Sequence, residues 1–89
     1  MENSYDQAQR GIVGIKSAVL QTIASPSNTD GLKTSEISRA LGISYGYVGE
    51  DGKFGHRDYL ARTILAIMEA EGSIFRTDSG GWIVKRIPR

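Results

Sequence analysis

The run HRDYLARTILAIMEAE, residues 56–71, contains the side chains best suited to contact a ligand. Its apolar residues recur at helical spacing, which leaves Tyr59 and Arg62 on the other side of the helix, near its N-terminus. A core helix has no use for an outward aromatic hydroxyl and guanidinium there, whereas a helix lying in a DNA groove does. The pattern therefore makes Tyr59 and Arg62 candidate nucleic-acid contacts.

Two alternatives compete with that interpretation. Arg62 stands four residues after Asp58, so the two side chains could simply form an exposed ion pair worth about 0.2–0.5 kcal/mol. Asp58 and Glu69 also share the outward side of the helix, where their charges would repel phosphates. Both effects favour a structural role for Arg62 over a contact with DNA.

The segment SYGYVGEDGKFG, residues 44–55, carries glycine at every third position from Gly46 onward and is expected to be a loop. From this loop, Lys53 could contact a phosphate backbone, and Tyr45 and Tyr47 could stack on bases. The tyrosines could equally cover a small core. GYVG and GKFG match the G-x-x-G loop of KH domains, but the flanking order of helices and strands is wrong for that fold.

Three helices are expected to position these residues. The apolar spacing predicts a first helix over residues 7–24, which Pro26 closes. A second, short helix is predicted to have Thr34 as its N-cap and to stop at Gly42. In the third helix, residues 56–71, the side chains predicted to face the core are Leu60, Ile64, Ile67 and Met68.

The residues after Gly72 alternate in polarity and predict a β-hairpin, with strands at residues 73–77 and 82–87 joined by the turn DSGG. Trp82 has a large apolar area and is predicted to pack in the core. The cations of this hairpin could lie along a phosphate backbone or form an ordinary solvated strand face; they are Arg76, Lys85 and Arg86.

Length and composition exclude several classes of protein. The chain has 89 residues, enough for one small domain, and its net charge of +1 counts against an unspecific polyanion binder. It has no cysteine, and its one histidine, His56, is badly spaced from Asp58 for a catalytic triad. We therefore expect no enzymatic activity, no metal and no cofactor. Because we find no signal peptide or membrane-spanning run, we expect a cytoplasmic protein without a membrane partner.

The order of these elements resembles a winged helix-turn-helix domain. The resemblance rests on LKTSEISRALGIS (residues 32–44), EGSIFR (71–76) and GGWIVKRI (80–87), which are similar to segments of MarR-like DNA-binding domains. An aromatic and glycine loop before H-x-x-Y-L-x-R is also similar to winged modules of some restriction enzymes. Where the usual motif has a turn of about 3 to 4 residues before the third helix, this chain has residues 44–55.

The resemblance implies an α+β fold with three helices followed by a two-stranded β-hairpin wing. It would cover residues 7–89, after a frayed segment at residues 1–6. It also implies that the protein binds double-stranded DNA, either sequence-specifically or structure-specifically. Helix 56–71 would enter the major groove and hairpin 73–87 would lie on the backbone, in a small transcriptional regulator or in the DNA-recognition module of a larger protein.

Carried over by position, the resemblance places Tyr59 and Arg62 in the groove and His56 and Arg57 near the DNA backbone, where N–H groups at a helix start attract phosphate. The N-terminal helix is the candidate contact for a homodimer. A winged helix also serves as a protein–protein interaction module, and fold analogy alone does not choose between that role and DNA binding. From Glu50 onward the chain has seven Lys or Arg against six Asp or Glu, so the basic excess is slight.

Overall fold

Helix α1 spans Ser4–Ile23 and is capped by Asn3, whose Oδ1 accepts the N–H of Asp6 at 2.8 Å. It begins before the expected start at residue 7, so residues 4–6 are helical rather than frayed. The structure is a computed structural model that describes residues 3–25, 28 and 30–84, with the backbone alone at Tyr45, Tyr47, Phe54 and His56.

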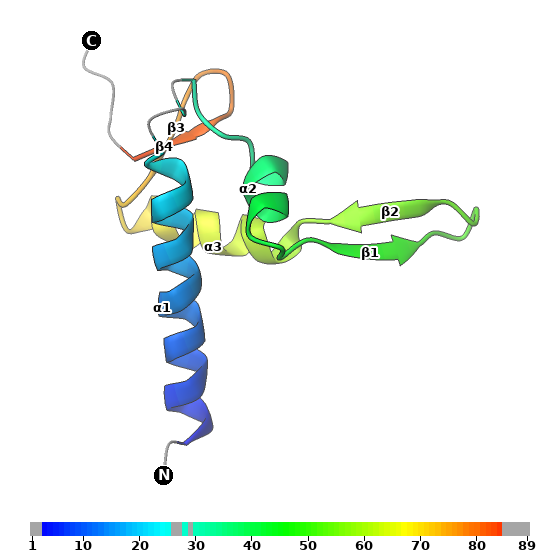
Figure 1. The fold of residues 1–89 in the computed structure, drawn as a ribbon, viewed down its shortest axis with the longest axis horizontal. Helices are drawn as coiled ribbons and strands as arrows, with labels where there is room; N and C mark the ends of the chain where they lie inside the picture. Colours follow the sequence, from blue (N-terminus) through cyan, green and yellow to red (C-terminus); the bar gives the residue numbers. More distant parts are fainter. Residues whose placement is uncertain (1–2, 26–27, 29, 85–89) are drawn as a thin grey trace.

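The two halves of α1 have different surroundings. Val19, in the C-terminal half, is fully buried, whereas Tyr5 and Val13 in the N-terminal half are 69% and 63% exposed. Figure 1 shows this N-terminal half extending away from the rest of the molecule. Lys16 lies near the boundary, where its Nζ donates a 3.0 Å hydrogen bond to Glu71 Oε2 just after the third helix. That ion pair links α1 to the residue after the third helix, and Ile12 and Ile15 of α1 also pack, partly buried, against the core.

Helix α2, Thr34–Ala40, is held at both ends by local hydrogen bonds. Its N-cap is Lys33, whose backbone N–H donates to Glu36 Oε1 at 3.0 Å. Thr34 is therefore the first helical residue and not the N-cap that the sequence predicted. Gly42 ends the helix as predicted, because its φ of +66° is a left-handed conformation that glycine adopts readily.

The segment predicted to be a glycine-rich loop is an antiparallel hairpin of β1 (Tyr45–Val48) and β2 (Phe54–Arg57). At its tip the N–H of Gly49 donates to the carbonyl of Lys53, and the N–H of Gly52 donates to the carbonyl of Gly49, both at 2.9 Å. Gly52 has a φ of +78°, which a three-residue turn with a glycine bulge requires. The loop prediction is wrong because this turn closes a ladder that offsets the weak strand propensity of glycine.

Helix α3 spans Tyr59–Ala70, so the predicted helix over residues 56–71 begins too early. His56 and Arg57 belong to β2, because their pairing with β1 keeps the backbone extended up to Arg57. The helix starts only after Asp58, and this places the end of the hairpin directly against the first turn of α3.

The buried side of α3 is rotated from the predicted one. The buried residues are Ala61, Ile64, Leu65 and Met68. Leu60 and Ile67, which were expected to face the core, are 41% and 39% exposed. The prediction is wrong for these two residues because α3 packs against both α1 and α2, and a face that meets two helices centres on different positions from one that meets a single partner.

The second hairpin is shorter than the sequence predicted. Strand β3, Phe75–Arg76, pairs antiparallel with β4, Trp82–Ile83. The last predicted strand residues, 85–87, lie outside the described residues. Leu32 adds a bridge on the other side of β4: its N–H donates to the Trp82 carbonyl at 3.2 Å, and its carbonyl accepts the Trp82 N–H at 2.8 Å. The hairpin is thereby tied to the segment that leads into α2.

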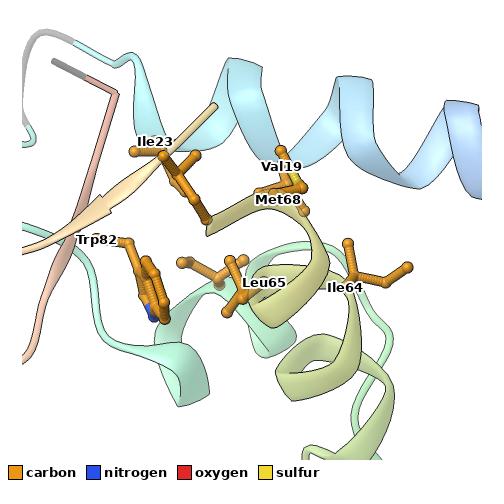
Figure 2. Packing of buried hydrophobic residues seen from close by; sticks show 8 residues of the cluster. Val19, Ile23, Ile64, Leu65, Met68 and Trp82 are labelled. Carbon is orange, nitrogen blue, oxygen red and sulfur yellow. The ribbon is translucent and has the colours of Figure 1, made fainter. Parts of the chain in front are cut away.

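A core of eight buried residues joins the three helices to the segment around the β3–β4 hairpin, and Figure 2 shows its packing. In this cluster Val19 and Ile23 come from α1, Ile64, Leu65 and Met68 come from α3, and Trp82 comes from β4. Trp82 is 3% exposed, which confirms its predicted place in the core. Full burial of one large apolar side chain contributes about 1.5–3 kcal/mol, so each member of this cluster favours folding substantially.

Two elements project from this core, the N-terminal half of α1 and the β1–β2 hairpin (Figure 1). The radius of gyration is 14.9 Å, against about 12 Å for a compact domain of this length, and the molecule measures 45 × 45 × 21 Å. The described residues form an α+β fold with three helices and two antiparallel hairpins. None of the described helices combines the length and the hydropathy needed to cross a membrane.

Candidate functional site

Arg57 and Tyr59 are joined at the point where the β1–β2 hairpin meets α3. The guanidinium of Arg57 donates a 3.1 Å hydrogen bond from Nη1 to the hydroxyl of Tyr59, and its Cζ lies 5.4 Å from the centre of the Tyr59 ring. Both contacts hold the cation beside the first residue of the helix. Tyr59 is 51% exposed, so a ligand can reach this pair from solvent.

Arg62 lies one helical turn beyond Tyr59 and is exposed. Its backbone N–H donates to the carbonyl of Asp58 at 2.9 Å, as in any helix, but within the described part of the chain no ion pair joins the two side chains. The ion pair between Arg62 and Asp58 that the sequence left open is therefore not formed in the structure. We call Arg57, Tyr59 and Arg62 the α3 patch.

Lys53 lies at the far end of the hairpin, where it is exposed. Its backbone N–H donates to Oδ1 of Asp51 at 3.0 Å, and its carbonyl accepts from Gly49, which leaves the ammonium outside the turn's own hydrogen bonds. Glu50 and Asp51 stand beside it as exposed acids. The tip therefore carries mixed charge, with one of the two carboxylates engaged in the turn.

Three other candidate residues occupy defined backbone positions on the hairpin. Tyr45 pairs with Arg57, Tyr47 with Gly55, and His56 with Gly46. His56 is consequently a strand residue and not the start of a helix, so the predicted role for it at a helix N-terminus is wrong. The two tyrosines, which were predicted to lie in a loop, therefore lie on strand β1.

The candidates at the C-terminal hairpin are not gathered with the α3 patch. The guanidinium of Arg76 lies 4.7 Å from the ring of Trp82, a cation–π contact at the opposite side of the α2–α3 pair from the β1–β2 hairpin (Figure 1). Lys85 and Arg86 lie outside the described residues. The structure thus brings Arg57 and Tyr59 into contact, with Arg62 one helical turn along α3, and separates Arg76 from them.

Sequence reasoning missed two features of this surface. The hairpin had one clear signal, the dipeptide Asp51-Gly52 between alternating segments, which is typical of tight hairpin turns. The exposure of Leu60 and Ile67 had none, because apolar spacing on a helix does not reveal how many neighbours the helix has. An exposed apolar strip on α3 is therefore a finding of the structure.

The described residues contain no group of three or more His, Asp or Glu side chains placed to bind a metal ion. A surface depression lies on the projecting half of α1, lined by Asp6, Gln9, Arg10, Val13 and Gly14.

In comparisons with known proteins, no family model, curated protein or solved structure matches the chain.

Proposed function

We propose that the protein binds double-stranded DNA through the α3 patch, with α3 in the major groove. In this proposal the chain is a winged helix-turn-helix domain that serves as a small transcriptional regulator or as the DNA-recognition module of a larger protein. Its support is the order of α2, α3 and the β3–β4 hairpin, together with the exposed side chains of α3. An α-helix is about 10–12 Å across with its side chains, which suits a major groove about 12 Å wide.

The observation that carries the proposal is the contact between Arg57 and Tyr59, with Arg62 one turn further on. A guanidinium that is already held against an aromatic ring loses less side-chain freedom when it binds a phosphate. Arg62, exposed on the same end of the helix, has the donor geometry to read a guanine edge. The patch thus combines a backbone contact with a base contact.

The acids of α3 oppose this binding less than their number suggests. Asp58 is half-buried and precedes the first turn, while Glu69 stands seven residues after Arg62. Seven residues correspond to about 10 Å along a helix, which exceeds the Debye length of about 8 Å at physiological ionic strength. Glu69 therefore weakens binding at the C-terminal end of α3 more than at the α3 patch.

Fluorescence anisotropy with a labelled random-sequence duplex tests the proposal. We expect binding at about 50 mM salt that weakens by a factor of about ten or more at about 200 mM, as several phosphate contacts require. Absence of binding at the lower salt concentration would falsify the DNA-binding proposal.

A second candidate function is protein–protein interaction, and specific exposed apolar residues favour it. Leu60 and Ile67 expose apolar area on α3, and Tyr5 and Val13 do so on the projecting half of α1. A homodimer through α1 would cover the second pair. Light scattering across a range of protein concentrations tests this candidate: a mass that stays monomeric, in the wild type and in Val13→Lys alike, rules out the α1 homodimer.

A further inference from the structure

The β1–β2 hairpin is a projecting ribbon that is closed by its own ladder and turn. Figure 1 shows it extending from the start of α3, away from the core. None of its described side chains belongs to the buried core cluster, and Val48 on β1 is 70% exposed. A two-stranded ribbon alone is only marginally stable in water, but it has the dimensions to follow a DNA groove or backbone.

Two cations lie on one face of this ribbon. Lys53 and Arg57 are four residues apart on the same side of the hairpin, and the carbonyl of Lys53 still belongs to the ladder through its bond with Gly49. Because side chains alternate along a strand, Lys53 and Arg57 share a face, about 13 Å apart along the strand. Arg57 is in turn fixed to Tyr59 of α3.

The ribbon therefore presents two cations, Lys53 near its tip and Arg57 beside Tyr59 of α3. The carboxylate of Asp51 lies beside Lys53 but accepts its backbone N–H. Glu50 is the other exposed acid at the tip and would repel an anionic partner. Two cations spaced along one strand of the ribbon are complementary to a phosphate backbone, which carries a charge at regular intervals.

The described part of the β3–β4 hairpin is shorter than β1–β2 and is held to the body. Its strands have two residues each, and Leu32 and Trp82 tie β4 to the body. Arg76 is stacked on Trp82. We propose that the β1–β2 hairpin, and not β3–β4, is the ribbon that lies on DNA: Lys53 and Arg57 contact the phosphate backbone beside the groove that α3 enters. This inference rests on the proposed DNA binding.

Four variants test the inference by anisotropy on the same random-sequence duplex, after circular dichroism has confirmed that each is folded. Lys53→Ala changes an exposed side chain and should weaken binding about 3- to 10-fold and lower the slope of log affinity against log salt by about one. Lys53→Glu should weaken it further. Glu50→Gln should strengthen binding, because it removes the opposing charge. Arg76→Ala is the matched control on the rival hairpin and should bind within about twofold of the wild type.

The outcomes separate the two proposals. If the wild type binds DNA but Lys53→Ala and Lys53→Glu bind equally well, the hairpin makes no contact and the inference fails while DNA binding stands. If Arg76→Ala is the variant that loses affinity, β3–β4 is the wing. If the wild type does not bind duplex DNA at low salt, both proposals fail together.

Discussion

The indole Nε1 of Trp82 donates a 3.1 Å hydrogen bond to Oγ1 of Thr34, and this bond joins strand β4 to the first turn of α2. Trp82 is 3% exposed, so water cannot readily replace the acceptor. Thr34→Val keeps the shape of the side chain but leaves the indole N–H unpaired. We expect the free energy of unfolding to fall by about 1–3 kcal/mol, measured by urea denaturation.

Thr34→Ser is the control for this change, because it retains the hydroxyl and loses only a methyl group. It should unfold closer to the wild type than Thr34→Val does. Equal midpoints for the wild type and Thr34→Val would show that the bond contributes no net stability.

Gly31 and Gly81 bring two backbone segments into direct contact. A Cβ built on Gly81 would lie 2.6 Å from the carbonyl carbon of Gly31, closer than two carbon atoms can approach without displacement. Gly81→Ala should therefore push β4 away from the bridge at Leu32 and lower stability by about 1–3 kcal/mol, as overpacking does elsewhere. The change in thermal unfolding midpoint measures it.

Gly11→Ala provides the opposite case. A Cβ on Gly11, in α1, would meet no neighbouring atom within 4 Å. Alanine favours a helix over glycine by about 1 kcal/mol, so Gly11→Ala should raise helical content and leave or increase stability. A loss of stability in Gly11→Ala as large as in Gly81→Ala would contradict the packing argument for Gly81.

The sequence patterns predicted which segments would be helical more reliably than where those helices would begin. Periodicity identified α1 and α3, and the left-handed tendency of glycine identified the end of α2 at Gly42, because these signals act within one or two turns. Helix α3 was predicted to start at His56 but starts at Tyr59, because pairing between β1 and β2 keeps the backbone extended at His56. Such pairing depends on residues about ten positions away in the chain, and local propensity does not register it.

The exposure of two candidate residues was predicted, but their arrangement beside Arg57 was not. Tyr59 and Arg62 are exposed on α3 as the helical spacing indicated, because exposure of polar residues follows from periodicity alone. The contact between Arg57 and Tyr59 could not be read from the sequence, since it requires one residue to be in a strand and the other in a helix. DNA binding itself stays a proposal.

Ser38 is fully buried in α2, and among the described residues its Oγ has no hydrogen-bond partner. A buried hydroxyl without a partner costs about 1–3 kcal/mol in lost hydration, and serine is also a weaker helix former than alanine. Ser38→Ala should therefore raise the free energy of unfolding, by about 1 kcal/mol. A clear decrease in chemical denaturation would show that the hydroxyl has a partner in solution, such as a bound water.

Arg62 is the residue of the α3 patch expected to read a base, and its substitution separates base contact from phosphate contact. Against a duplex selected for tight binding, Arg62→Ala should lose about 1–3 kcal/mol, or roughly 5- to 150-fold in affinity, as loss of a bidentate contact to guanine does. Against a random duplex the loss should be several-fold at most, because there the guanidinium contributes only its charge. Arg39→Ala is the matched control, since it removes an equal charge from the exposed surface of α2 and should affect both duplexes alike. Equal losses on both duplexes for Arg62→Ala would make Arg62 a phosphate contact, and specificity would then have to come from another residue of α3 or from the shape of the DNA.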